Sequence, residues 1–343
     1  MTKKQKAYAR AGVDVELGNR LKRQIQSLLK KTHPAAAGQV LGEIGGFGGL
    51  FRTNFPGMRQ PVLVASMDGV GTKLKIAFAM NKHDTVGTDL VNHCVNDIAV
   101  LGARPLFFLD YIGCEKLEPK VFRQLLRGLS RACRSAGCAL LGGETAQMPG
   151  MYRKGEYDLA GCIVGVVDRA KIIDGSKIQP GDVVLGLGSN GLHTNGYSLA
   201  RKILFEKMRL EPSSPLPGST ITVGEELLRV HKNYQPLLAK IPSGAIKGLA
   251  HITGGGLIDN LPRILPQNCD AVIETKSWRV PRIFQILQQN GDVDAAEMYQ
   301  VFNMGIGMVV IVAGQDAQRA KSILRAKEIG RIERGSRKTV LKL

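Results

Sequence analysis

Short apolar runs alternate with amphipathic stretches along this 343-residue chain. The runs Pro61 to Met67 and Pro105 to Leu109 have the length of buried strands, whereas the apolar residues of Asp89 to Leu101 recur at helical spacing. Strands that alternate with helices pair into a sheet and bury the apolar faces of the helices against it. Because both halves of the chain alternate in this way, we expect an α/β (α+β-like) fold of two packed domains. The turn-rich run Asp168 to Gly181 is the expected junction, which places the domains at residues 1–172 and 173–343.

An acidic residue follows the first of these strands. Asp68 stands where the run Pro61 to Met67 ends, so its carboxylate can point into a cleft. Gly69 and Gly71 leave backbone N–H groups open to phosphate oxygens, and Lys73 supplies a mobile positive charge. The spacing of a Walker A loop occurs nowhere in the sequence. A β-turn with a solvated Asp and Lys explains this segment equally well.

The predicted helix Asp89 to Leu101 carries an unusual polar face. The face holds only short residues that can act as ligands, and it has no basic residue to pair with its acids. That composition favours a face turned toward a bound cation over one turned toward water. The residues of this face are Asp89, Asn92, His93, Asn96 and Asp97.

A third acidic position follows a second helix. This helix has a buried stripe from Val121 to Cys133 and ends at Gly137, and the short strand Ala139 to Leu141 then leads into a Gly-Gly-Glu sequence that ends at Glu144. One site for Mg²⁺ and a nucleotide explains most simply why carboxylates recur in three similar settings. The predicted metal ligands are Asp68, Asp97 and Glu144.

Glycine-rich segments supply further candidates. The cluster Gly42 to Gly49 is either a flexible cover over the nucleotide phosphates or a plain surface loop. Two loops of the second half, Gly188 to Ser198 and His251 to Gly256, each place a histidine beside glycines and small hydroxyl or amide residues. Such loops bind phosphate through N–H groups, which leaves His193 and His251 for proton transfer or oxyanion contact. The alternative for a lone loop histidine is an ordinary surface residue.

Several long motifs, in order along the chain, carry a resemblance to a known family. From about Tyr8 to the C-terminus the chain resembles the phosphoribosylformylglycinamidine cyclo-ligases, the aminoimidazole ribonucleotide synthetases of purine synthesis. The wider superfamily shares the acidic Mg-ATP motifs but not the whole set. The motifs are Asp68 to Lys73, Cys94 to Asp97, Pro105 to Tyr111, Gly142 to Ala146, Met148 to Tyr152, His193 to Ser198 and Thr253 to Gly256.

The resemblance implies two packed α/β domains of the aminoimidazole ribonucleotide synthetase superfamily. Residues 1–172 would bind Mg-ATP and form the dimer contact, and residues 173–343 would bind the substrate. The implied reaction is ATP-dependent cyclisation of formylglycinamidine ribonucleotide to aminoimidazole ribonucleotide, with release of ADP and phosphate. Phosphorylation turns the amide oxygen into a good leaving group before the amidine nitrogen attacks the activated carbon. The implied cofactors are ATP and Mg²⁺, and the implied partners are the small-molecule ribonucleotide and a second copy of the chain in a homodimer.

The resemblance also assigns residues to each task. Those assigned to ATP are Gly45, Gly46, Phe47, Gly48, Gly49, Asp68, Gly69, Gly71, Thr72, Lys73, Gly142, Gly143 and Glu144. Those assigned to the substrate are Asp110, His193, Thr194, Asn195, Gly196, Thr253, Gly254, Gly255 and Gly256. The candidate catalytic residues are His193, His251 and Lys73.

The charge of the chain admits a rival interpretation. The formal net charge is +18, and residues 1–31 and 316–343 each hold nine Lys or Arg against two or three acidic residues. A nucleic-acid-binding protein would use such basic ends. Only 5% of the residues are aromatic and no recognised nucleic-acid motif is present, which argues against that class. Anionic substrates also benefit from a positive field.

Cysteine usage and hydropathy indicate the compartment. The six cysteines include no Cys-x-x-Cys pair and lie mostly in apolar segments, as expected of reduced thiols in a cytoplasmic protein. No apolar run follows the N-terminal lysines, and no stretch is long enough to span a bilayer. We therefore expect neither secretion nor membrane insertion.

Overall fold

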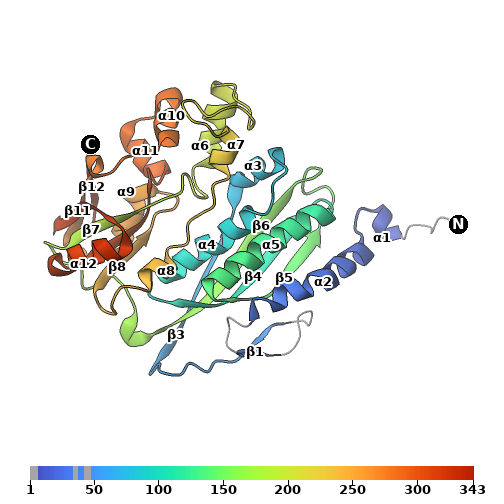
Figure 1. Ribbon diagram of the computed structural model, residues 1–343, viewed down its shortest axis with the longest axis horizontal. Coiled ribbons are helices and arrows are strands. Elements are labelled where there is room, and N and C mark those ends of the chain that lie inside the picture. Colours follow the sequence, from blue (N-terminus) through green and yellow to red (C-terminus); the bar gives the residue numbers. More distant parts are fainter. Residues whose placement is uncertain (1–6, 34–37, 42–47) are drawn as a thin grey trace.

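The computed structural model describes residues 7–33, 38–41 and 48–343. Two sheets divide the chain, one built from the first half and one from the second (Figure 1). The last strand of the first sheet ends at Asp168 and the first strand of the second begins at Val183. The predicted boundary at residues 172 and 173 falls within this connection.

The first sheet has four strands in the order β3-β6-β4-β5. Strands β4 and β5 are parallel, and the other neighbours are antiparallel. Helices α4 and α5 lie side by side over one face (Figure 1), and α2 packs against α5 and β5. The elements are α1 (Ala7–Arg10), α2 (Val15–Lys30), β3 (Pro61–Gly69), α3 (Leu74–Ala79), α4 (Val86–Ala99), β4 (Arg104–Cys114), α5 (Pro119–Ala136), β5 (Ala139–Gln147) and β6 (Tyr157–Asp168).

Strand β3 shows that the other face of this sheet is open. Its side chains alternate, with Leu63 58% and Met67 69% exposed while Val62 and Val64 pack on the helix-covered side. A strand that is buried on one side only was not expected from its continuous apolar sequence. The open face is therefore an apolar surface in the single chain.

Helix α5 follows its sequence signals closely. Pro119 occupies the first turn, where its missing N–H costs nothing, and Phe122 and Leu129 lie on the buried stripe. Gly137 caps the C-terminus in the left-handed conformation with φ 71°, which a side chain would disfavour. The predicted end of this helix is confirmed.

The second sheet has six strands in the order β12-β9-β11-β7-β10-β8, and only β9 and β12 are parallel. Every residue of β10 is buried, because helices cover both faces of the sheet. Alternation of helices and strands in sequence thus coexists with mostly antiparallel pairing. The elements are β7 (Val183–Gly188), α6 (Tyr197–Arg201), α7 (Val223–Leu227), α8 (Gln235–Leu238), β8 (Ile246–His251), α9 (Gly256–Asn260), β9 (Cys269–Glu274), α10 (Arg282–Gly291), α11 (Ala295–Val301), β10 (Ile306–Val312), α12 (Gly314–Leu324), β11 (Lys327–Arg334) and β12 (Thr339–Lys342).

A small ribbon precedes the first sheet. Strands β1 (Val40–Leu41) and β2 (Leu50–Phe51) pair with each other on either side of the predicted glycine cover. Within that cover, Gly45, Gly46 and Phe47 lie outside the described residues. Among the helices described, none is both long and apolar enough to cross a membrane.

Candidate active site

Two predicted metal ligands, Asp68 and Asp97, come together at the edge of the helix-covered face. Asp68 lies near the end of β3 and Asp97 in the last turn of α4, and their side chains are 41% and 24% exposed. The N–H of Gly69 donates to Oδ1 of Asp68 at 2.6 Å, and the hydroxyl of Ser66 donates to Oδ2 of Asp97 at 3.1 Å. Both carboxylates are therefore oriented, and both still reach solvent.

His93 lies between these two carboxylates. Its Nε2 is 2.8 Å from Oδ2 of Asp68 and 3.6 Å from Oδ2 of Asp97. Burial disfavours the imidazolium, but the hydrogen bond to Asp68 and the charges of Asp97 and Asp68 outweigh burial and raise the pKa of His93. The protonated ring offsets part of the repulsion between two acids that face the same small region.

His251, the last residue of β8, supports Asp97 from the other half of the chain. Its Nδ1 is 2.8 Å from Oδ1 of Asp97. Burial opposes ionisation of Asp97, yet the hydrogen bond from His251 helps to hold the pKa of Asp97 below its ordinary value. Nδ1 of His251 must therefore carry a proton. Burial lowers the pKa of His251, so the ring is neutral and its Nε2 is an acceptor.

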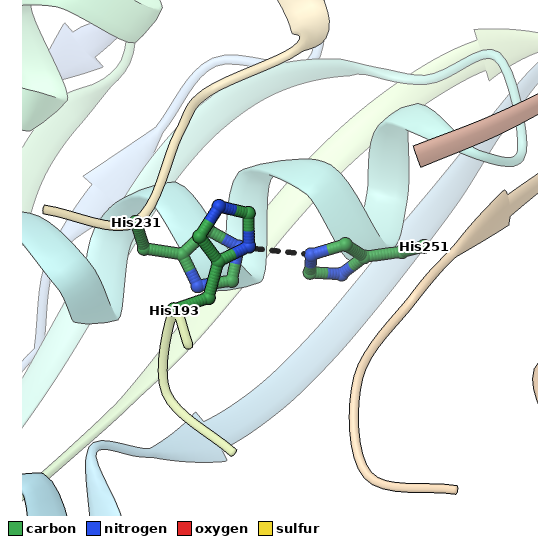
Figure 2. Close-up of side chains that lie close together, drawn as sticks. All are labelled: His193, His231 and His251. Atoms are coloured by element: carbon green, nitrogen blue, oxygen red, sulfur yellow. Dashed lines mark hydrogen bonds between the residues drawn. The ribbon is translucent and has the colours of Figure 1, made fainter. Parts of the chain in front are cut away.

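His231 continues this series of hydrogen bonds. Its Nε2 faces Nε2 of His251 at 2.9 Å (Figure 2), and because the latter nitrogen is an acceptor, His231 donates. Burial lowers the pKa of His231 well below its ordinary value, so Nδ1 carries no proton. This nitrogen accepts from the hydroxyl of Thr194 at 3.2 Å, and the Thr194 oxygen accepts from Nδ1 of His93 at 2.8 Å.

An unbroken hydrogen-bonded path thus runs from Asp97 to Asp68. We refer to its members, His251, His231, Thr194 and His93, as the imidazole chain. Exposure of their residues ranges from 0% for His231 to 8% for Thr194, so these groups lie behind the carboxylates and do not face solvent. Because α4 supplies one ring and the second half supplies the others, the path exists only when the two halves are packed together.

His193, His231 and His251 form a cluster with candidate metal-ligand atoms within 4.8 Å of one another (Figure 2). The proton positions argue against a metal here. Nε2 of His193 accepts the N–H of Asn190 at 3.1 Å, and burial holds the pKa of His193 well below its ordinary value. Nδ1 therefore carries the single proton of this neutral ring, although it has no hydrogen-bond partner among the described residues. His193 also stacks on His231 with ring centroids 4.1 Å apart and an interplanar angle of 22°, so their lone pairs do not converge on one point. We interpret His193 as a packing partner of His231.

Lys73 does not reach solvent. Its side chain is fully buried, with Nζ 2.8 Å from Oδ2 of Asp89, and it donates to the carbonyls of His193 at 3.0 Å and Arg229 at 2.7 Å. The two carbonyls accept hydrogen bonds from the ammonium group, and the Asp89 carboxylate is its counter-ion. Such a geometry does not fit the mobile charge that the sequence predicted at the phosphates. Lys73 instead ties the first half of the chain to the second.

The polar face of α4 is likewise turned toward the second half, and only Asp97 at its end reaches solvent. It packs on the main chain of residues 231–234. Short side chains suit this position because each meets a main-chain donor or acceptor directly. The contacts are Asp89 Oδ1 with the N–H of His231 (2.6 Å), Asn92 Nδ2 with the carbonyl of His231 (2.7 Å), and Asn96 with the carbonyl of Lys232 (2.8 Å) and the N–H of Tyr234 (2.9 Å).

Glu144, the third predicted metal ligand, is not brought to the other two within one chain. The strand register aligns Asp68, Gly161, Asp110 and Gly143 in one row across the sheet, and Glu144 stands in the next row. Because successive residues of a strand point to opposite faces, Glu144 faces the open side of the sheet. Asp110 and Glu144 lie inside strands and not at strand ends, since β4 continues to Cys114 and β5 to Gln147.

Asp110 lies in this row, with its side chain on the helix-covered face of the sheet. A Cβ at Gly143 would stand 2.5 Å from Oδ1 of Asp110, so only glycine fits beside the carboxyl group. Burial, together with the charge of Glu144, raises the pKa of Asp110 to about 7. This carboxyl group therefore changes its charge close to neutral pH.

The predicted substrate loops of the second half meet each other. A Cβ at Gly254 would stand 3.3 Å from Oδ1 of Asn195, and Oγ of Ser198 is 3.2 Å from Oγ1 of Thr72 in the first half. Thr72, Ser198 and Gly254 are exposed. Unlike the buried histidines, these groups are accessible to a ligand.

The backbone explains several of the remaining glycines. Gly196, Gly255 and Gly256 all have positive φ, and a Cβ at Gly256 would collide with the carbonyl oxygen of Tyr299. Thr253 beside them is half-buried, Gly48, Gly71 and Gly143 are exposed, Gly142 is half-buried, and Gly49 packs against the side chain of Leu141. The backbone path or close packing therefore accounts for Gly49, Gly71, Gly143, Gly196, Gly255 and Gly256, whereas at Gly48 and Gly142 an added Cβ would meet no atom closer than 3.9 Å.

His231 is the residue of this site that the sequence analysis missed. It is a lone histidine between Val230 and Lys232, with neither glycines nor a periodic pattern around it. Its role follows only from contacts with distant parts of the chain. Asn96, by contrast, was among the polar residues of the predicted helix face.

Comparison with known proteins agrees with this architecture. Models of the AIR synthase related protein match the N-terminal domain at residues 57–167 and the C-terminal domain at residues 179–342. A phosphoribosylformylglycinamidine cyclo-ligase from Trichlorobacter lovleyi is 54% identical over 317 residues, which cover 92% of this chain and 90% of that protein. One from Bacillus thuringiensis subsp. konkukian is 48% identical over 340 residues, which cover 96% of each. The chain belongs to the phosphoribosylformylglycinamidine cyclo-ligase family. It is an ATP-dependent ligase of the step in purine biosynthesis that forms aminoimidazole ribonucleotide.

Solved structures of other proteins share this fold. The thiamine-monophosphate kinase of Stenotrophomonas maltophilia matches with a TM-score of 0.68 at 17% identity, over 92% of this chain and 95% of that one. The hydrogenase maturation protein HypE in complex with ATP matches with a TM-score of 0.65 at 18% identity, over 93% and 90%. At these identities the likeness concerns the fold alone, and it confirms the predicted fold class.

Proposed function

We propose that the carboxylates of Asp68 and Asp97 form part of the ATP site in this cyclo-ligase and bind Mg²⁺ there. The observation that carries the proposal is that the two carboxylates, from β3 and α4, both lie beside Nε2 of His93 while their side chains stay partly exposed. Two partly exposed carboxylates are a donor set that Mg²⁺ accepts when phosphate oxygens and water complete its shell. The ion would neutralise phosphate charge during phosphoryl transfer. ATP supplies the phosphoryl group that converts the amide oxygen of formylglycinamidine ribonucleotide into a leaving group.

In our proposal the histidines support these carboxylates from the protein interior. His251 orients Asp97 through its Nδ1–H, and neutral, buried His193 packs on the ring of His231. Neither ring contacts the ribonucleotide in this arrangement. The exposed groups of Thr72, Ser198 and Gly254 are better placed to contact an anionic substrate.

Substitution of the acids tests this assignment. We expect Asp68→Asn and Asp97→Asn each to lower ADP formation about 100-fold or more, because charge lost beside transferring phosphate costs several kcal/mol. Asp84→Asn is the matched control, since Asp84 precedes the same helix and is 38% exposed beside Arg131. Near-normal turnover in a folded Asp97→Asn variant would return this residue to a purely structural role.

Substrate choice is tested by one parallel assay. ADP release is measured with formylglycinamidine ribonucleotide, thiamine monophosphate and selenide, each offered with Mg-ATP. We expect turnover with the first compound only. Turnover with thiamine monophosphate would instead make the chain a kinase on the same fold.

We also propose that the chain forms a homodimer through the open face of the first sheet. The exposed Leu63 and Met67 lie on this face, and Glu144 shares it. Met67→Glu should yield a monomer in analytical ultracentrifugation, whereas Val340→Glu, at an exposed position of β12 in the second sheet, should not. A dimeric Met67→Glu protein would contradict this interface.

All six cysteines are free thiols, which supports a reducing compartment such as the cytoplasm.

A further inference from the structure

The side chain of His231 is the least exposed part of the imidazole chain and belongs to none of the predicted motifs. Its ring makes hydrogen bonds at both nitrogens, to His251 on one side and to Thr194 on the other. It is held by its backbone as well, since Asp89 accepts its N–H and Asn92 donates to its carbonyl. A ring fixed at this many points has one orientation only, and it transmits that orientation to the groups that it contacts.

The contact with His251 has a defined direction. Nδ1–H of His251 donates to the carboxylate of Asp97, which leaves Nε2 of that ring as an acceptor buried among protein atoms. Nε2–H of His231 is the donor at 2.9 Å. The amide nitrogen of Asn96 lies farther from both rings, 3.4 Å from Nε2 of His251 and 3.3 Å from Nε2 of His231. Without the donor on His231, Nε2 of His251 would lose its one short hydrogen bond.

We propose that His231 is a positioning residue of the cyclo-ligase site: it fixes the ring orientation and tautomer of His251, and through His251 the carboxylate of Asp97. His231 touches neither carboxylate, so its effect on the reaction passes through His251. The stacked ring of His193 and the hydroxyl of Thr194 hold His231 itself in place. The proposal rests on the role given above to Asp97.

Two amide substitutions separate the two hydrogen bonds of this ring. The amide nitrogen of Gln extends about as far as Nε2 of histidine, whereas that of Asn reaches only about as far as Nδ1. His231→Gln therefore retains a donor toward His251, and His231→Asn retains a polar atom toward Thr194 only. We expect kcat to fall about 10–100-fold in His231→Asn, the usual cost of losing an outer positioning contact, and to be largely restored in His231→Gln.

The tautomer is read directly by ¹⁵N NMR of the imidazole rings. The chain has six histidines, so each ring can be assigned by single substitution. We expect His251 to show a protonated Nδ1 and a hydrogen-bonded, unprotonated Nε2, and this pattern to be lost in His231→Asn and kept in His231→Gln. His83→Asn is the matched control, because His83 is also buried and bonded through Nδ1, to Tyr157, away from the carboxylates.

The outcomes are distinct. Equal losses of kcat in His231→Asn and His231→Gln that follow their losses of thermal stability would reduce His231 to a structural residue and overturn the proposal. An unchanged His251 spectrum in folded His231→Asn would overturn it as well. If the spectrum changes while kcat does not, the orientation of His251 is without consequence for turnover and the proposal is overturned as well. The role proposed for Asp97 is decided separately, by Asp97→Asn.

Discussion

The buried pair of Lys73 and Asp89 gives the most decisive test of the structure. Lys73→Met removes the ammonium group while keeping most of the length of the side chain. Asp89 then remains in the interior with the N–H of His231 as its hydrogen-bond donor. The carbonyl of Arg229 loses the ammonium donor, and the carbonyl of His193 keeps only the hydroxyl of Tyr197. Breaking a fully buried ion pair on one side typically costs about 3–5 kcal/mol. For a chain of 343 residues that loss corresponds to a melting temperature lower by about 4–7 °C.

The pH dependence of this loss has a predictable sign. Burial raises the pKa of Asp89, and removal of the Lys73 charge, which opposes that shift, raises it further. A carboxyl whose pKa is raised in the folded state contributes its stability at low pH and loses it as pH rises through that pKa. Lys73→Met should therefore be closest to the wild type in acid and furthest from it in alkaline buffer.

Lys75→Met is the matched control for this measurement. Lys75 lies two residues further on and forms an ion pair of 2.7 Å with Glu156, but its side chain is 36% exposed. Surface pairs of this kind contribute about 0–1 kcal/mol, so the melting temperature should change by less than about 2 °C. Differential scanning calorimetry of both variants decides the matter. A Lys73→Met protein that melts with the wild type but forms no ADP would refute the structural role and restore Lys73 to the phosphates.

Two further outcomes follow from single positions. The pKa of Asp110 is raised to about 7, so its folded carboxyl group contributes stability that is fully present below its unfolded pKa near 3.8 and is lost as pH rises through about 7. The melting temperature of Asp110→Asn should therefore rise relative to that of the wild type between pH 5 and pH 8. Melting temperatures of the two proteins that run parallel over this range would contradict the prediction. Gly256→Ala should destabilise the second half strongly, since φ is +56° and the added Cβ meets the carbonyl of Tyr299, whereas Gly254→Ala should be mild in the same chemical-denaturation series.

Local signals in the sequence predicted local structure well. Helix α5 begins at a proline and ends at a glycine in the left-handed conformation, as its pattern indicated. The amphipathic spacing of α4 was equally reliable, and it brought Asp97 close to Asp68. Strand ends were less predictable, because pairing with neighbours extends β4 and β5 through Asp110 and Glu144, beyond the apolar residues.

What the polar groups contact could not be predicted in the same way. A helix face of Asp and Asn residues has the same composition whether it packs against main chain or faces a bound cation. Only the position of residues 229–234 shows that the face of α4 packs against main chain. Lys73 was misinterpreted for the same reason, since its partner Asp89 and two acceptor carbonyls come from other segments. His231 carries no local signal at all. Long-range contacts, and not residue type, decide these roles.

Helix α4 and Lys73 contact the second half through main-chain atoms of residues 229–234. Asp89, Asn92 and Asn96 bond to amides and carbonyls there, and Lys73 to one more carbonyl. An interface of this kind is sensitive to spacing and, apart from the buried His231 and Tyr234, largely indifferent to which side chains the segment displays. Exchange of the outward residues in relatives should leave the docking intact, whereas deletion of a single residue would misalign every donor and acceptor at once. Insertions and deletions, more than point substitutions, are the changes that this junction between the two halves excludes.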